Sequence, residues 1–187
     1  MRHVFWLIPG KVAGRAGPDQ SPWDVSHLKA NGIDAVLTVN DGFLVKPEEF
    51  AKHGIDYAHI PFSANAPPIP GDIEICLSAL PKAFTFVQTA VKSGKTVMIH
   101  CTSGKDRTGL VMCHFLMQTQ GLTVDEAIRE VRSVRPIALS AAGWEGFGRE
   151  ILRLLDPKGQ EDIASGGRAG DRVTGTHKDH PSGNNRA

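Results

Sequence analysis

The chain has 187 residues, of which 41% are hydrophobic, and its formal net charge at pH 7 is +1. This length fits one ordinary domain with a hydrophobic core, and the hydrophobic fraction is that of a globular protein. A net charge this small gives no general attraction to nucleic acid or to an anionic membrane surface, so we expect no nucleic-acid partner and only local anion binding. The apolar segment 4–8 is too short for a signal peptide or a membrane span, so we expect no stable membrane insertion.

The three cysteines, Cys76, Cys101 and Cys113, do not show the spacing of a disulfide framework. Free thiols suit a reducing compartment, and together with the absence of a targeting signal they predict a cytoplasmic protein. Cys76 and Cys113 fall in segments with helical periodicity, so we expect both to be core thiols. Cys101 has a different setting, described below.

Strand-like and helix-like segments alternate along the chain, which indicates an α/β fold. The first part is expected to contain a strand over residues 4–8, a helix over 22–30, a strand over 35–39, a helix over 47–52 and a strand over 57–60. Ser21 is predicted to cap the first of these helices, with Pro22 at its first position.

The second part is expected to contain a helix over 72–91, a strand over 96–99, a helix over 107–120, a helix that follows Thr123, and a last amphipathic segment over 144–155. Pro81 should kink or split the helix that contains it. Thr123 and Glu126 form a capping box. Residues 157–187 carry almost no large apolar side chain, so we predict one domain over residues 1–156 and a disordered tail.

The ten residues from His100 to Gly109 carry most of the chemical information. Cys101 stands six positions before Arg107, where the predicted strand turns into the predicted helix 107–120. Such a turn brings several backbone N–H groups together at a helix N-terminus, and this arrangement binds a phosphate-sized anion. The same field would hold Cys101 as a thiolate.

These residue types match the needs of phosphomonoester hydrolysis without a metal or cofactor. The thiolate of Cys101 would attack phosphorus and form a phosphocysteine. The phosphate oxygens would lie against the backbone amides of Thr102, Ser103, Gly104, Lys105, Asp106 and Arg107. The guanidinium of Arg107 would bind two oxygens at once, which lysine cannot do. Thr108 would donate its hydroxyl to the sulfur and help it leave in the second step, while His100 would fix the loop from below.

Two other patterns in the chain are rejected. The neighbouring His/Cys pairs at 100–101 and 113–114 suggest metal ligands, but adjacent residues point in different directions and no second spaced pair exists. Residues 94–96, Gly-Lys-Thr, imitate the end of a nucleotide-binding loop. That motif needs a glycine where this chain has Thr89, and it opens a helix rather than a strand.

The loop resembles that of the cysteine-based protein tyrosine phosphatase superfamily, and within it the small atypical dual-specificity phosphatases. The likeness extends, in the same order, to residues 6–14, 31–37, 60–68 and 130–136. It implies a central, mostly parallel sheet of about four to five strands flanked by helices. It also implies Cys101 as the nucleophile and Arg107 as the phosphate ligand.

The chain departs from this family at the general acid. The family usually carries an aspartate on the loop that here spans residues 61–68, where no carboxylate stands. Loops of the form Gly-Lys-Asp-Arg-Thr occur in lipid-directed and bacterial members, where the loop aspartate has been considered for proton transfer. Asp106 is therefore one candidate donor, with pairing to Lys105 as its alternative role. Asp72 is the other candidate, although an N-cap of the following helix is the favoured role.

A second departure lies after Pro136, where related enzymes often carry a glutamine that positions water and this chain has Ala-Ala-Gly-Trp at 141–144. The leading hypothesis is a monomeric protein tyrosine or dual-specificity phosphatase acting on phosphorylated proteins. Lys105 adds a second cation, which favours a phosphoinositide or inositol phosphate as the alternative substrate. A phosphate-binding module with little turnover is the alternative from another class, while sulfur transfer fits the spacing to Arg107 less well.

Overall fold

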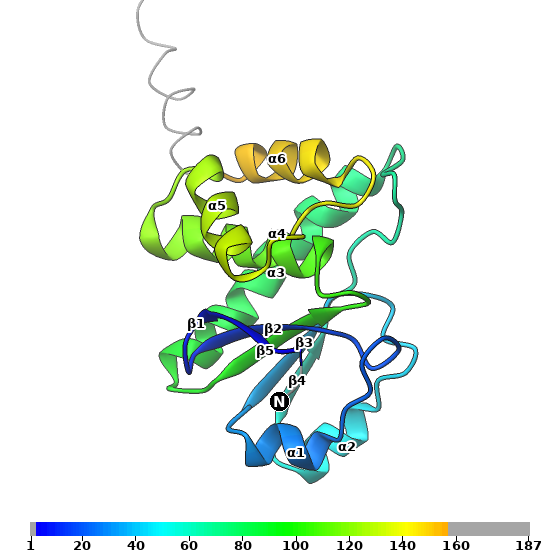
Figure 1. The fold of residues 1–187 in the computed structure, drawn as a ribbon, viewed down its shortest axis with the longest axis vertical. Coiled ribbons are helices and arrows are strands. Elements are labelled where there is room, and N and C mark those ends of the chain that lie inside the picture. The colour runs from blue at the N-terminus through cyan, green and yellow to red at the C-terminus, as the bar shows by residue number, and fades with distance from the viewer. Residues whose placement is uncertain (1–2, 157–187) are drawn as a thin grey trace, which may run out of the picture.

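A five-stranded mixed sheet runs through the middle of the molecule, with helices on both faces (Figure 1). The structure is a computed structural model that describes residues 3–156, so the predicted disordered tail lies outside the described residues. The strands are β1 (Phe5–Ile8), β2 (Val12–Ala16), β3 (Ala35–Thr38), β4 (Asp56–His59) and β5 (Val97–Cys101). Their spatial order is β1-β2-β5-β3-β4. Only β1 runs antiparallel to its neighbour, which confirms the predicted mostly parallel sheet.

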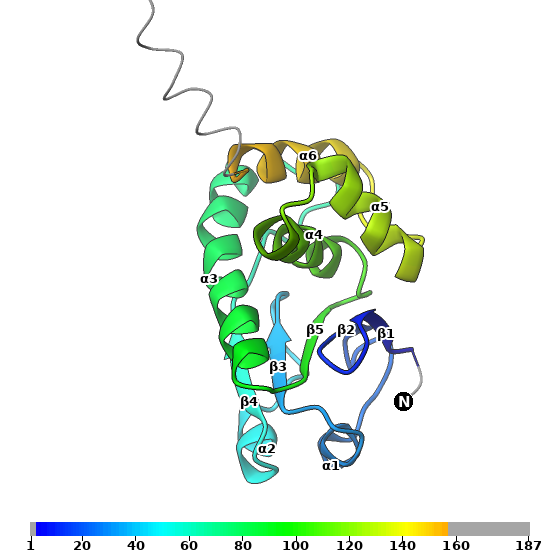
Figure 2. The same ribbon diagram turned by 90° about the vertical axis from the view of Figure 1, so that its left-hand side faces the viewer.

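Two short helices lie on one face of the sheet and four longer helices lie on the other, the last of which packs on the other three rather than on the strands (Figure 2). The short ones are α1 (Val25–Ala30) and α2 (Pro47–Lys52). The long ones are α3 (Asp72–Lys92), α4 (Asp106–Gln120), α5 (Val124–Val134) and α6 (Trp144–Leu154). Side chains alternate across a strand, so Met98 of β5 packs with the α1–α2 side and Ile99 with the α3–α6 side. Among the described helices, none is long and apolar enough to cross a bilayer.

The start of α1 differs from the prediction. The helix begins at Val25, and its N-cap is Asp24, whose carboxylate accepts from Ser26 N over 2.7 Å. The prediction that Ser21 caps this helix is wrong, and Ser21 instead contacts Arg15. Its carbonyl and hydroxyl oxygens both accept from the guanidinium of Arg15, each over 2.9 Å.

Two more differences concern β2 and α3. Strand β2 was not predicted from the sequence; it pairs with β1 on one side and with β5 on the other. Helix α3 is continuous through Pro81, so the predicted split is wrong. The capping box at Thr123 and Glu126 is confirmed at the start of α5.

The central position of β5 fixes where a site can lie. Its carboxyl end lies between the parallel neighbours β2 and β3, and it leads directly into α4. In open α/β sheets, ligands bind at the carboxyl ends of parallel strands, where loops and helix N-termini meet.

Candidate active site

The loop between β5 and α4, residues 102–105, turns carbonyl groups outward, where Arg135 binds them. Arg135, the C-cap of α5, donates from Nη2 to the carbonyl of Ser103 over 2.8 Å and from Nε to the carbonyl of Gly104 over 3.1 Å. Within the described residues, none of the backbone N–H groups of this β5–α4 loop donates a hydrogen bond. The loop therefore keeps a set of unused donors at the N-terminus of α4, the arrangement that binds anions.

Close packing against β2 fixes the shape of the β5–α4 loop. Gly104 has a φ of +59°, and a Cβ there would lie 2.4 Å from the backbone carbonyl of Arg15. Both the left-handed backbone and the lack of space require glycine at this position. Gly17, just after β2, donates its N–H to the carbonyl of Thr102 over 2.9 Å. The first carbonyl of the loop is therefore also held from outside.

Three predicted site residues meet at this junction of strand and helix. Cys101 is the last residue of β5 and is 1% exposed. Arg107 and Thr108 follow in the first turn of α4. The Nε of Arg107 and the hydroxyl of Thr108 are buried, and neither has a hydrogen-bond partner among the described residues. Buried polar groups normally have partners, so these two groups point to a ligand that completes the site.

His100 lies under the β5–α4 loop, fully buried in β5. Its Nε2 is 2.7 Å from the hydroxyl of Thr38 at the end of β3. The ring of Trp23 approaches it edge-on, with the centroids 4.6 Å apart. Burial lowers the pKa of His100 to about 3, so the imidazole is neutral and acts through hydrogen bonding and packing.

Asp106, the first residue of α4, faces the segment between α5 and α6. Its Oδ1 accepts from the backbone N–H of Ala141 over 3.0 Å, and its Oδ2 lies 3.7 Å from Nζ of Lys105. The carboxylate of Asp106 is thus hydrogen-bonded to the α5–α6 segment, in which related enzymes often carry a glutamine that positions water. Asp106 connects that stretch to the β5–α4 loop.

Asp72, the second candidate donor, is bound by the loop that precedes α3. It is the first residue of α3 and Gly71 is the N-cap, so the predicted N-cap role of Asp72 is wrong by one position. Its carboxylate accepts from Ile69 N over 2.7 Å and from Nδ2 of Asn65 over 2.9 Å. Burial alone would raise the pKa of Asp72, but hydrogen bonds from Ile69, Ser63 and Asn65 outweigh burial and place that pKa below its ordinary value.

Sequence reasoning missed three residues that contact the predicted site. Arg135 holds two loop carbonyls, and Thr38 bonds to His100. Asn40 donates from Nδ2 to the hydroxyl of Thr102 over 3.3 Å, and both residues line a hollow of about 290 Å³ beside the loop. The sequence signal for Thr38 and Asn40 was their position at the carboxyl end of a buried strand. No local pattern singled out Arg135.

The other two cysteines lie outside the β5–α4 loop, in the helical core. Cys76 lies in α3 and Cys113 in α4, both fully buried, as predicted for core thiols. Burial raises the pKa of Cys76 to about 11 and the pKa of Cys113 to about 12, so both remain protonated thiols at neutral pH. Among the described residues, no group of three His, Cys, Asp or Glu side chains is placed to hold a metal ion.

The fold defines the class of protein as protein tyrosine phosphatase-like. A crystal structure of Tk-PTP in the active form superimposes with a TM-score of 0.67 and 26% identity, covering 83% of this chain and 97% of that one. Human DUSP28 shares the fold, with a TM-score of 0.63 and 18% identity over 83% of this chain and 96% of its own.

Sequence comparison then gives the family. Residues 19–146 match the dual specificity phosphatase catalytic domain, and the chain belongs to that family, which confirms the resemblance. Dual specificity protein phosphatase 12 of mouse is 31% identical over 159 residues, covering 85% of this chain and 43% of the relative. Phosphatidylglycerophosphate phosphatase PTPMT2 of Arabidopsis thaliana is 29% identical over 136 residues, covering 72% of this chain and 57% of the relative. The chain thus spans about half the length of these curated relatives.

Proposed function

We propose that the chain is a cysteine-dependent phosphomonoester hydrolase of the protein tyrosine and dual-specificity type. The observation that carries this proposal is the β5–α4 loop, whose carbonyls are held outward while its N–H groups find no acceptor in the part of the chain that the structure describes. Such a set of fixed donors in front of a cysteine stabilises the charge that develops on a phosphoryl group during transfer. Family membership supports the same reaction.

In the proposed first step, the thiolate of Cys101 attacks phosphorus and the bond from phosphorus to the leaving oxygen breaks. The loop amides and the guanidinium of Arg107 bind the non-bridging oxygens and remain bound as charge develops on them. The leaving oxygen takes a proton from water or from a carboxyl group, for which Asp106 and Asp72 are the candidates. In the second step, water attacks the phosphocysteine and releases phosphate, while the hydroxyl of Thr108 donates to the departing sulfur.

The contacts of Asp106 favour a role in positioning the α5–α6 segment. One carboxylate oxygen already holds Ala141 N, and the other lies next to Lys105. Asp106 would then fix the α5–α6 segment against the β5–α4 loop, which is where water must approach the phosphocysteine. The competing role, proton donation to the leaving group, predicts a different dependence on leaving-group chemistry.

For the substrate, we propose a phosphorylated protein, with a phosphoinositide or inositol phosphate as the second candidate. Relatives in the family are named as protein phosphatases and as phosphatidylglycerophosphate phosphatases, which supports both classes. The second candidate rests on Lys105, whose ammonium group is partly exposed beside Asp106 and could bind an additional phosphate. If Lys105→Ala lowers kcat/KM equally on phosphotyrosine peptides and on inositol phosphates, Lys105 does not select headgroups.

The central test compares two buried cysteines in the full chain. Cys101→Ser should abolish release of phosphate from an aryl phosphate, and Cys113→Ser, which makes the same change in the core of α4, should keep the turnover of the folded protein. Acid quenching of the wild type with radiolabelled substrate should trap a phosphocysteine. Full turnover by Cys101→Ser would refute the proposal. Phosphate binding by the wild type without release would favour the alternative of a binding module.

We also propose that the protein is a cytoplasmic monomer. The three cysteines are free in the structure, which suits a reducing compartment. Light scattering coupled to size-exclusion chromatography tests the monomer, and a fluorescent fusion of the full chain tests the compartment. A dimer mass at micromolar concentration would contradict the first part.

A further inference from the structure

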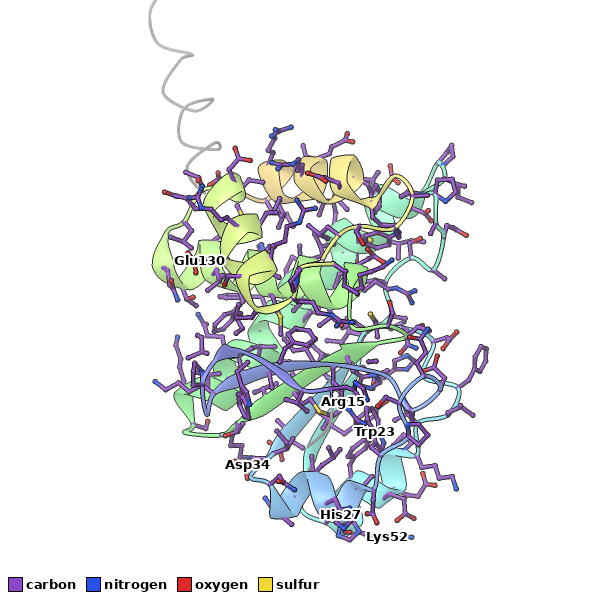
Figure 3. The ribbon with its side chains drawn as sticks, in the orientation of Figure 1. Arg15, Trp23, His27, Asp34, Lys52 and Glu130 are labelled. Atoms are coloured by element: carbon purple, nitrogen blue, oxygen red, sulfur yellow. The ribbon has the colours of Figure 1, made fainter. Side chains whose placement is uncertain are left out.

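A cavity lies on the opposite face of the sheet from α3–α6, between β2 and α1. Its volume is about 370 Å³, within the range of small-molecule sites. The lining is mostly polar, with Arg15, Gln20, Ser21, Trp23 and His27 among its residues. Figure 3 shows Arg15 and Trp23 next to one another below the sheet, with His27 on α1. None of the residues proposed for catalysis lines this cavity.

Arg15 is a buried cation that lacks an anionic partner. It is 5% exposed, and none of the ion pairs formed by the described residues includes it. Asp24 is the carboxylate that lines the same cavity, but it accepts from the N–H and the hydroxyl of Ser26 as the cap of α1. Buried charges in proteins are normally paired, because an unpaired one is costly to desolvate.

The guanidinium of Arg15 is held in one orientation. Its Nη2 donates to both oxygens of Ser21 over 2.9 Å and to the carbonyl of Pro22 over 3.1 Å. Its Cζ lies 5.1 Å from the centre of the Trp23 ring. Nη1 donates to no group among the described residues and, unlike Nε, is not among the fully buried atoms. The free donor of a fixed cation therefore remains accessible at a cavity that Arg15 itself lines.

We propose that this cavity is a second binding site, which takes a small organic oxyanion. A carboxylate or phosphate-type group would pair with the free edge of Arg15, near His27, and the body of the ligand would pack against Trp23. Burial lowers the pKa of Arg15, as expected for a cation whose counter-ion is missing. This site does not depend on the proposed phosphatase activity, because it uses none of the β5–α4 loop.

The test follows the indole N–H signals of the three tryptophans by NMR in the full chain, with Trp23 assigned from the spectrum of Trp23→Phe. Benzoate and phenylphosphonate serve as probes and distinguish a carboxylate from a phosphate-type group. They are added up to about 10 mM, which nearly fills a site with a Kd of about 1 mM. We expect the Trp23 signal to shift saturably with at least one probe. If Trp23 shifts no more than Trp6 and Trp144, the proposal is wrong.

Variants separate this site from the active site and from general charge effects. Arg15→Gln should weaken binding about tenfold or more, because a charged hydrogen bond is lost. If this variant does not fold, His27→Glu still places a carboxylate in the cavity and should weaken binding more than His53→Glu, the same change outside it. Arg107→Ala should leave the Trp23 titration unchanged within about twofold. Loss of the Trp23 shift in Arg107→Ala, or equal binding by the two glutamate variants, would overturn the proposal.

Discussion

Two loops at the carboxyl edge of the sheet handle their polar groups in opposite ways. The β5–α4 loop has its carbonyls bound from outside and leaves its N–H groups without partners among the described residues. The loop between β4 and α3, residues 60–71, donates hydrogen bonds from Ile69 and Asn65 to the carboxylate of Asp72, the first residue of α3. The β5–α4 loop has N–H groups available to bind an external anion, whereas the donors of the β4–α3 loop already bind the carboxylate of Asp72. Related enzymes usually carry their general acid on the second loop, where in this chain the carboxylate of Asp72 already accepts from Ile69 N and Asn65.

The largest effect should come from changing Arg107, whose guanidinium is proposed to bind two phosphate oxygens at the β5–α4 loop. Arg107→Lys keeps the charge but loses two parallel hydrogen bonds, and the buried Nε already lacks any other partner. We expect kcat/KM on an aryl phosphate to fall on the order of 10²–10³-fold. Arg129→Lys, the same change at an exposed position of α5, should stay near wild type. A loss below about threefold for Arg107→Lys would show that the loop amides alone carry the binding.

The next prediction tests whether the hydrogen bonds from Arg135 to the loop carbonyls align the loop amides for anion binding. Arg135→Gln removes the two donors to Ser103 and Gly104, so the loop amides should lose their alignment. We expect kcat/KM to fall about tenfold or more, together with slower alkylation of Cys101 by iodoacetamide at a fixed pH.

Arg132→Gln is the matched control for this prediction. Arg132 donates to the carbonyl of Ala138 over 3.1 Å and pairs with Glu145, so it holds the same α5–α6 segment without touching the β5–α4 loop. Its loss should reduce stability while leaving the alkylation rate of Cys101 unchanged. Equal alkylation rates for the Arg135 and Arg132 variants would mean that Arg135 acts only through stability.

The two loops also differ in how much of each the sequence could predict. In the β5–α4 loop the informative residues are neighbours in the chain, so the spacing of Cys101 and Arg107 was enough to locate it. Arg135 acts on carbonyls that lie 31 and 32 positions away, and carbonyls have no residue signature. Asp106 is similar, because its partner is the backbone N–H of Ala141.

Within the fold, the elements that were missed depend on distant partners. Gly14 and Arg15 interrupt the apolar pattern of β2, and the strand exists because β1 and β5 pair with it on both sides. The ring of Phe5 occupies the space over Gly14, which explains a glycine inside a strand. The cap of α1 could not be located either, because Arg15 takes the oxygens of Ser21, six residues away.

A smaller effect should decide between the two roles of Asp106. If it positions the α5–α6 segment, Asp106→Asn should lower turnover by a similar factor, about tenfold, on aryl and alkyl phosphates, since both need the same water. A proton donor would instead make the loss far larger on alkyl phosphates, whose leaving groups are poor. The measurement is kcat over a series of leaving groups, with Asp72→Asn as the control on the other loop. A steeper leaving-group dependence in Asp106→Asn alone would contradict positioning.

The smallest effect concerns stability and pH, and it is centred on Asp72. Its pKa is lowered in the folded state, so its contribution to stability is complete above the unfolded pKa and is lost as pH falls through the folded pKa. Asp72→Asn should therefore reduce the free energy of unfolding at pH 7 by about 1–3 kcal/mol, because the amide cannot accept from Ile69 N and Asn65 as the carboxylate does. The gap to wild type should narrow at an acidic pH below the ordinary aspartate pKa of about 3.9, because the wild-type carboxyl takes up its proton as the pH falls. Urea unfolding at both pH values measures the gap, and the exposed Asp41→Asn should shift it by less than about 0.5 kcal/mol. If the difference in unfolding free energy between wild type and Asp72→Asn stays constant with pH, the negative charge of Asp72 does not stabilise the protein. The loop of residues 60–71 would then not depend on an internal anion, and the contrast with the β5–α4 loop would be weaker than the contacts indicate.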